Sequence, residues 1–395
     1  MKQTDLCESG KSLSLAQKGY SLFGGELEHN RLVNQQFQTV RREKLEHGSI
    51  FLMPSGRGNR YETKLPWKSN PEELDCNFET VTRRFDNLKI KLDKNKDICE
   101  EYKRIIDKQL KNGIVEECSD NSLFSGYFMP HQAVIRPEKE TSRVRIVFDA
   151  SSKGKNSKSL NDLLFSEPNL IPDLLHIILT FRKYEIAFCS DIEKAFLNIS
   201  IAQEDSKYLK FLWFDIKNNE DFKVMNMQRL PFGFTSSPFI LTATIKNHLK
   251  IYININPECV NMLNSSLYVD DLFYGTDTVN NAYRITSDAV DILKHASMNL
   301  CKFNSNSQEL KDMWLSNNTA VSSSLAPAKI LGLNWNTDED FIKIETSALE
   351  QCIKHIKNIT KRSVLQLVAK IYDPTGFISP FIMNFKILLQ KIWMK

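Results

Sequence analysis

The sequence lacks the common signals for secretion, membrane insertion and zinc binding. Its eight cysteines are scattered, with no CxxC pair and no Cys/His spacing of a zinc finger, which indicates free thiols in a reducing compartment. The polar N-terminus contains no apolar core of a signal peptide. No run approaches the roughly 18 apolar residues that span a bilayer. We therefore expect an intracellular protein, cytoplasmic or nuclear, that has no membrane partner.

The sequence also lacks a strong net charge and has no low-complexity segment. The 52 basic and 48 acidic residues leave a net charge of +4, which permits a polyanionic partner without requiring one. With 395 residues, of which 42% are hydrophobic, the chain is long enough for two or three lobes with sizeable cores. Residues 1–70 show little periodicity, and we expect them to be a poorly structured N-terminal region and linker.

Patterns beyond residue 70 alternate between helical and strand spacing, which favours an α+β sheet backed by helices. Apolar residues at helical spacing predict a helix over 97–110, with Gly113 at its C-terminal cap. Further expected elements are a mostly buried helix at 170–184, a strand running into Asp191, β segments within 207–214 and 222–234, a helix from Ser236-Ser237-Pro238, a helix at 279–297, a strand at 329–335 and helices after Thr346.

A basic hairpin is predicted between the first helix and the second. Two apolar strands flank the polar turn 137–141, and the second strand places Arg143 and Arg145 on one face. A solvated strand face is the plain alternative. The lysines that follow favour a concentration of positive charge around this hairpin: Lys153, Lys155 and Lys158.

Three aspartates stand at the ends of apolar strands. Asp191 follows IAFCS, and Asp270-Asp271 follow SLYV with no lysine or arginine beside them. Asp270-Asp271 are also compatible with an ordinary hairpin turn, and Asp191 with a helix N-cap. Taken together, buried acids of this kind favour a hard divalent cation, and three carboxylates suit two Mg²⁺ ions about 4 Å apart for phosphoryl transfer.

The blocks around these acids follow one another in a recognisable order: RIVFDAS, SDIEKAFLNI, LPFGFTSSPF, YVDD, LCKFNSNS, LGLNW and IYDPTGFISPF. Together they resemble the reverse transcriptase of Bel/Pao LTR retrotransposons, over roughly residues 45–395. KLPWK at 64–68 resembles the segment that leads from the protease into the polymerase of that polyprotein. The resemblance implies an α+β right-hand polymerase fold with fingers, a palm with an antiparallel sheet, and the start of a thumb.

The resemblance also implies roles for individual residues. Asp191, Asp270 and Asp271 match the catalytic, metal-binding triad, with Ile192 beside them, and imply Mg²⁺, with Mn²⁺ as a substitute. Residues expected to bind the nucleotide are Arg145, on the triphosphate, and Asp149, Phe196, Phe232 and Gly233. Residues expected at the primer or template are Tyr268, Val269, Leu331 and Gly332, while Lys302 is a candidate general acid.

Several of these residues have plain alternatives, and one departs from the retroviral pattern. Phe196, expected to exclude a 2′-hydroxyl, also fits a helix core, and Lys302 also fits a solvated surface. Phe232 stands where retroviral enzymes have Gln, so a polar contact to the nucleotide is absent. A protease is not expected, because Glu8-Ser9-Gly10 lacks the Asp of D-[ST]-G. No room for an RNase H or an integrase is expected after residue 381.

The expected division is fingers at 71–184, palm at 185–335 with fingers segments at about 200–230, and a primer-grip end with partial thumb at 336–395. The expected partners are an RNA or DNA template–primer and deoxynucleoside triphosphates, and the sequence does not indicate an oligomeric state. Two alternatives to a polymerase are a truncated or inactive relic that binds nucleic acid without copying it, and an interaction module. The intact triad, Arg145 and Phe196 favour the enzyme.

Overall fold

The computed structural model describes most of the chain after residue 60. The described residues are 53–54, 60–118, 126–135, 144–154, 157–166, 168–214, 222–322, 328–356 and 358–394. Arg143, Lys155 and the expected turn at 137–141 lie outside them. Within the described part, no helix is long and apolar enough to cross a membrane.

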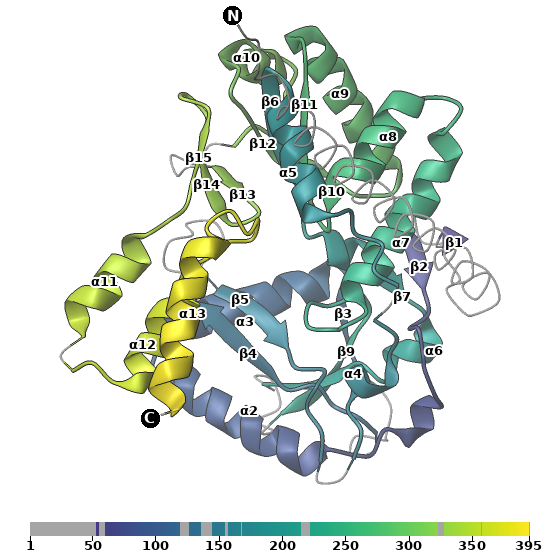
Figure 1. The fold of residues 1–395 in the computed structure, drawn as a ribbon. Helices are drawn as coiled ribbons and strands as arrows, with labels where there is room; N and C mark the ends of the chain where they lie inside the picture. The colour runs from purple at the N-terminus through teal and green to yellow at the C-terminus, as the bar shows by residue number, and fades with distance from the viewer. Residues whose placement is uncertain are drawn as a thin grey trace, which may run out of the picture.

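A four-stranded antiparallel sheet, here called the central sheet, carries the predicted acids (Figure 1). Its strands, in spatial order, are β10 (Leu267–Tyr268), β11 (Asp271–Thr276), β6 (Ile186–Ile192) and β12 (Leu300–Ser305). Because side chains alternate along a strand, β6 directs Ala187 and Cys189 to one face and Phe188 to the other. The predicted strand ending near Asp191 is confirmed.

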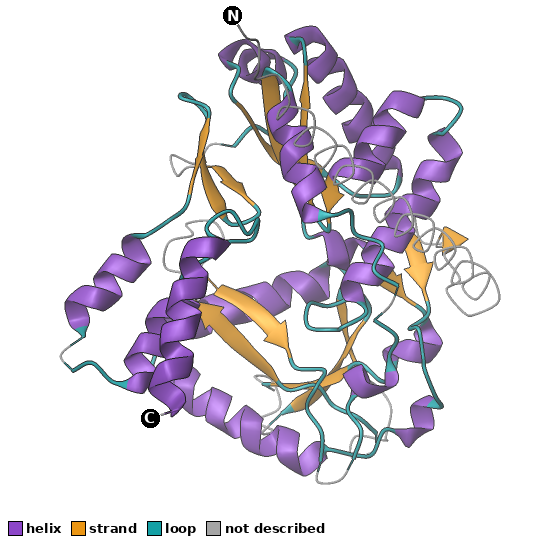
Figure 2. Ribbon diagram, in the orientation of Figure 1, coloured by secondary structure: helices purple, strands orange, loops and turns teal. Residues whose placement is uncertain are grey.

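Helices cover both faces of the central sheet (Figure 2). The helices involved are α5 (Leu174–Lys183), α8 (Pro257–Ser266), α9 (Val279–His295) and α10 (Gln308–Ser316). Phe181 of α5 packs with Cys189 and Phe273 on one face. Phe188, on the other face, packs against Trp314 of α10.

The expected helix at 170–184 was wrong in two respects. It begins only at Leu174, after the N-cap Asp173, whose side chain accepts a hydrogen bond from the amide of His176. It is also not mostly buried, since Leu175 and Leu179 are 50% and 61% exposed. Only one stripe of the helix faces the sheet.

A second layer lies at the bottom of the view in Figure 1. It consists of α2 (Phe78–Asp93), α3 (Lys96–Lys111), the antiparallel pair β4 (His131–Ile135) and β5 (Val144–Phe148), and the sheet of β3 (Val115–Glu117), β9 (Lys223–Met227) and β8 (Lys210–Trp213). The predictions of α3 and of the hairpin strands are confirmed, and Gly113 adopts a φ of +60° just after α3. Strands β8 and β9 pair with β3 and not with the central sheet.

Short elements join the two layers. They are β1 (Met53–Pro54), β2 (Tyr61–Thr63), η1 (Pro71–Glu73), α4 (Leu160–Leu163), η2 (Ala195–Asn198), β7 (Ser200–Ile201), α6 (Gln203–Ser206), α7 (Ser237–Leu249) and η3 (Lys250–Tyr252). The helix expected after Ser236 is confirmed by α7, which has proline in its first turn.

The segment at 60–70 differs from the expected poorly structured region. Strand β2 pairs in parallel with β7. The buried carboxylate of Asp205 accepts hydrogen bonds from the amide of Leu65, at 2.6 Å, and from the indole of Trp67, at 2.9 Å. These contacts join segments that lie far apart in the sequence, so no local pattern of residues predicts them.

The chain ends in a small sheet and three helices. These are β13 (Ala328–Ile330), β14 (Leu333–Asn336), β15 (Phe341–Lys343), α11 (Ser347–His355), α12 (Lys361–Ala369) and α13 (Ser379–Met394). The expected helices after Thr346 are confirmed. The expected single strand at 329–335 was wrong, because Leu331-Gly332 reverse the chain and divide it into β13 and β14.

Candidate active site

Two of the predicted acids face each other across neighbouring strands. Asp191 of β6 and Asp271 of β11 are directly paired in the antiparallel register. The amide of Ile192 donates to the carbonyl oxygen of Asp270 at 2.8 Å, which fixes the third acid beside them. Side chains directly opposite in such a pair lie on one face, here the face that Cys189 and Phe273 share. The fold therefore brings the backbone of all three acids together.

A tight turn presents Asp270 between β10 and β11. Val269, a β-branched residue, has a φ of +60°, a conformation that such residues rarely adopt outside functional sites. The prediction of a hairpin at YVDD is confirmed. Burial and then the charge of Asp191 raise the pKa of the Asp270 carboxyl, while Arg145 and Lys302 act in the opposite direction. The alternative of Asp191 as a helix N-cap was wrong, because it lies inside β6 and the cap of η2 is Lys194.

Lys302 contacts the first of the acids. Its ammonium nitrogen lies 2.5 Å from Oδ2 of Asp191, and the thiol of Cys301 donates to Oδ1 at 3.5 Å. Burial is the largest single influence and lowers the pKa of Lys302, but the hydrogen bond to Asp191 and the negative charges of Asp191, Cys301 and Asp271 together outweigh it and raise the pKa. The side chain is still 62% exposed, so the alternative of a solvated lysine is not contradicted, and its role as a general acid stays a prediction.

The carboxylates of Asp191, Asp270 and Asp271 are of the type that binds a hard cation, although their side chains are not arranged around a common metal position. Carboxylate oxygens are the donors that Mg²⁺ prefers. Two like charges directly opposite each other on neighbouring strands destabilise the pairing, and a bound cation would relieve this repulsion. Among the described residues, no group of three or more His, Cys, Asp or Glu side chains is already arranged to hold a metal. The carboxylate of Asp191 is engaged by Lys302 instead.

An aromatic ring connects two of the expected nucleotide-binding residues. The guanidinium carbon of Arg145 lies 4.7 Å from the ring centre of Phe232, within the range of a cation–π contact. The rings of Phe232 and Phe196 meet edge to face, with their centres 4.7 Å apart. Phe196 is 6% exposed, in η2. Phe196 therefore packs in the core, as the alternative of a helix core expects, and its role at the nucleotide stays a prediction.

The loop that carries Phe232 is held against the end of β5. Gly233 has a φ of +111°, and a Cβ there would clash with the carbonyl oxygen of Phe148, so no other residue fits. Asn161 donates to the carbonyl oxygen of Gly233 at 3.2 Å and accepts from the amide of Thr235 at 3.0 Å. Asn161 is a positioning residue that the sequence did not single out.

Asp149 makes a contact that its sequence position did not predict. Its carboxylate accepts from Arg84 of α2 at 2.7 Å and from the amide of Ser151 at 3.1 Å. Two lysines of the expected basic concentration are also paired with acids, Lys153 with Asp162 and Lys158 with Glu73. The positive charge near the hairpin is thus partly neutralised.

Two of the residues expected at the primer, Tyr268 and Leu331, pack on the same sheet face as the acids, whereas Val269 packs against the cluster of the other face. Leu331 and Gly332 form the turn between β13 and β14, with φ values of 50° and 88°. Leu331 packs in one cluster with Cys189 and Phe273, and Tyr268 packs against that cluster. Tyr372, which the sequence did not single out, donates to the carbonyl oxygen of Leu331 at 2.6 Å.

Comparison with known families accounts for this arrangement. A family described as reverse transcriptase (RNA-dependent DNA polymerase) matches residues 101–306, which include every element of the central sheet. The chain belongs to the reverse transcriptase family. A second family, the Pao retrotransposon-like RNaseH-like domain, matches residues 360–395 of the chain. The resemblance to the Bel/Pao class is thereby confirmed. No curated protein matches the sequence.

Solved structures of foamy viral protease–reverse transcriptase resemble the fold. The form named dRH, in complex with double-stranded DNA, has a TM-score of 0.50 and 19% identity, covering 73% of this chain and 43% of its own. The complex with an RNA/DNA hybrid has a TM-score of 0.49 and 18% identity, and the match covers 74% of this chain and 33% of its own. The complex with double-stranded DNA has a TM-score of 0.46 and 20% identity, and the match covers 72% of this chain and 50% of its own. The chain thus spans less than half the length of the first, and its fold is the α+β right-hand polymerase fold.

Proposed function

We propose that this chain is a DNA polymerase that copies RNA and DNA templates by two-metal nucleotidyl transfer. The observation that carries the proposal is the direct pairing of Asp191 with Asp271 and the placement of Asp270 at the adjoining turn. Two like charges directly opposite each other are unfavourable unless positive charge lies beside them, and a divalent cation would supply more of it than the single ammonium group of Lys302.

Asp191, Asp270, Asp271 and the main chain of Ile192 are the groups that would hold Mg²⁺ or Mn²⁺. When bound, such ions lower the pKa of a hydroxyl group and stabilise negative charge on phosphate oxygens. For Asp191 to join this set, its carboxylate must leave Lys302. The released ammonium group then lies beside the reacting phosphates, where it suits the donation of a proton to pyrophosphate.

The remaining residues bind and orient the nucleotide and the primer. Arg145 has the fork geometry that pairs with phosphate oxygens, and Phe196 would exclude a 2′-hydroxyl so that deoxynucleotides are selected. The Leu331-Gly332 turn and Tyr268 would contact the primer end. We assign residues 71–184 to the fingers, 185–335 to the palm with fingers segments at about 200–230, and 336–395 to the primer-grip end and partial thumb.

Primer extension with Mg²⁺ on RNA and DNA templates tests the proposal. We expect the wild type to extend the primer and Asp270→Asn to lose at least about 100-fold of the rate while still binding template–primer. Asp277→Asn, at an exposed acid just after β11, is the matched control and should extend normally. Template binding by a wild type that does not extend would instead indicate the non-copying relic, and loss of both would indicate an interaction module.

A further inference from the structure

The turn at Leu331-Gly332 has a backbone conformation that its own sequence does not favour. Both residues have positive φ values, which is the geometry of hairpin turns that prefer Asn-Gly. Glycine adopts such values freely, but for leucine the left-handed conformation costs about 1–2 kcal/mol. Surrounding structure must therefore hold Leu331 in place.

Tyr372 supplies that support from the C-terminal segment. Its hydroxyl donates to the carbonyl oxygen of Leu331 at 2.6 Å. Its ring also covers Gly332 so closely that a Cβ on Gly332 would lie 2.8 Å from Cε1 of the tyrosine. Glycine is thus required at position 332 both by its φ and by the tyrosine ring. The Leu331-Gly332 turn and the C-terminal segment therefore contact each other through the side chain of Tyr372.

The segment after Tyr372 is itself tightly folded. The carboxylate of Asp373 accepts hydrogen bonds from the amides of Phe377 and Ile378 at 3.0 and 2.9 Å. Thr375 adds a hydroxyl bond to the same carboxylate, just before α13 begins. These bonds join Tyr372 to the first turn of α13 through a short, constrained loop. The loop therefore links the position of Tyr372 to that of α13.

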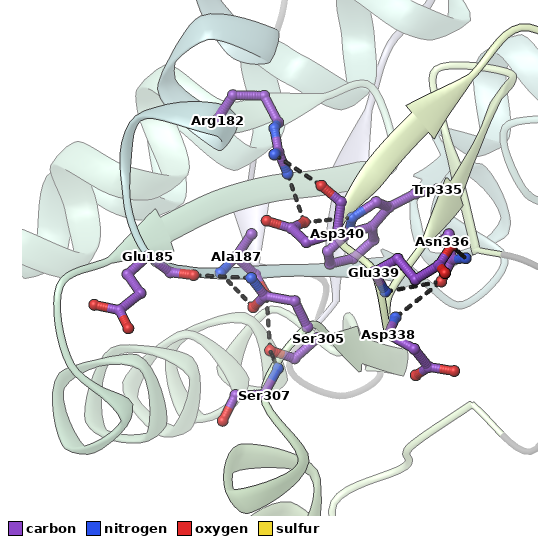
Figure 3. A network of polar contacts seen from close by, with 11 residues as sticks. Arg182, Glu185, Ala187, Ser305, Ser307, Trp335, Asn336, Asp338, Glu339 and Asp340 are labelled. Carbon is purple, nitrogen blue, oxygen red and sulfur yellow. Dashed lines mark hydrogen bonds and ion pairs between the residues drawn. The ribbon is translucent and has the colours of Figure 1, made fainter.

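The opposite side of the small sheet is fastened to the central sheet. The indole of Trp335 packs edge to face on Phe181, with ring centres 4.9 Å apart, and donates to Oδ1 of Asp340 at 2.9 Å. Arg182 of α5 donates to the same carboxylate at 2.5 Å and to the Asp340 carbonyl oxygen at 2.9 Å (Figure 3). Strands β13–β15 thus have a polar and aromatic attachment to α5.

We propose that Tyr372 is a positioning residue that couples the C-terminal helices to the Leu331-Gly332 turn and so sets where the primer end is held. The Asp340 attachment keeps the small sheet on the palm, and Tyr372 is its contact with the C-terminal helices. A shift of α12–α13 on binding template–primer would therefore act on the turn, whose Leu331 packs with Cys189 and Phe273 of the central sheet. This inference rests on the proposed polymerase function. It adds Tyr372 to the residues whose roles were inferred from the resemblance to reverse transcriptases.

Tyr372→Phe tests the coupling, because it keeps the ring over Gly332 and removes only the hydroxyl. We expect template–primer to dissociate about 5-fold faster, the amount expected for one hydrogen bond, and fewer nucleotides to be added per binding event. The rate of the first incorporation on a bound complex should also fall, because the primer end is held less well, while the KM for the nucleotide should stay unchanged. Tyr252→Phe, which removes a hydroxyl bonded to His295 away from this turn, is the matched control.

Hydrogen exchange of the protein alone gives a second readout that does not need catalysis. Amides of residues 328–336 should lose protection in Tyr372→Phe and keep it in Tyr252→Phe. Gly332→Ala, which forces the tyrosine ring away, should show the same loss together with faster dissociation. Unchanged protection and unchanged dissociation in both variants would overturn the coupling. A wild type that fails to extend primers would overturn the polymerase function, and the exchange result would still decide the role of Tyr372.

Discussion

Lys302 reaches Asp191 because strand β12 is irregular. In a regular strand, Cys301 and Lys302 would point to opposite faces, and only Cys301 lies opposite Asp191 in the register. The register shifts between Cys301 and Asn304, and Lys302 adopts a φ of 55°. The bulge therefore turns the lysine back, so that both side chains contact the same carboxylate.

This contact predicts that Lys302 competes with a cation for Asp191. Lys302→Met should tighten Mn²⁺ binding to the protein alone by about 5-fold, a modest effect because the ammonium group is largely exposed. Titration followed by electron paramagnetic resonance measures it, with Lys302→Arg as the control that keeps the charge. Unchanged Mn²⁺ affinity with a slower incorporation rate would instead identify Lys302 as the general acid alone.

Asp270→Asn should stabilise the metal-free protein while it removes activity. Burial and the neighbouring Asp191 both disfavour the charged carboxylate of Asp270, and an amide of the same shape carries no charge. We expect the free energy of unfolding to rise by about 1 kcal/mol at neutral pH in the presence of a chelator, measured by urea denaturation. Asp277→Asn, at an exposed position, should leave it unchanged. A destabilised Asp270→Asn would contradict this view of the site.

Phe232 should influence both nucleotide affinity and sugar selection, because its ring touches Arg145 and Phe196. Phe232→Leu removes the face on which the guanidinium lies and the edge contact that orients Phe196. We expect the KM for deoxynucleotides to rise about 3- to 5-fold and discrimination against ribonucleotides to fall by a similar factor. Steady-state incorporation of the two nucleotide classes measures both effects. Phe232→Tyr keeps the ring and should behave as the wild type.

His131 should make the protein less stable in mild acid. Its Nε2 donates to the carbonyl oxygen of Leu212 at 2.7 Å, and its Nδ1 accepts from the hydroxyl of Tyr102, so the buried ring is neutral. Burial lowers its pKa to about 4, below the unfolded value near 6.5. The unfolded state therefore binds the proton more readily, and stability is lost as the pH falls from 6.5 towards 4.

The expected loss from His131 is about 2 kcal/mol between pH 7.5 and pH 5. Urea denaturation at the two pH values measures it, and His131→Gln, which cannot titrate, should lack this part of the dependence. An identical pH dependence in the variant and the wild type would show that other groups govern acid stability.

The sequence alone determined the elements with strong local patterns. The helix α3, the proline-capped start of α7 and the YVDD hairpin were predictable because periodicity, capping and turn preferences act over a few residues. The order of the blocks around Asp191 and Asp270 likewise indicated the family, since it is written in the chain. Misplaced boundaries, such as the start of α5 at Leu174, came from an apolar run that continues beyond the helix.

Only the tertiary structure decided which side chains meet. The pairing of Asp191 with Asp271, the bulge that turns Lys302 towards them and the packing of Phe232 on Arg145 join residues far apart in the chain. The turn that divides 329–335 into two strands likewise contacts a distant residue, since Tyr372 donates to the carbonyl oxygen of Leu331, which has a positive φ. Contacts of this kind arise from strand register and packing, which local residue patterns do not encode.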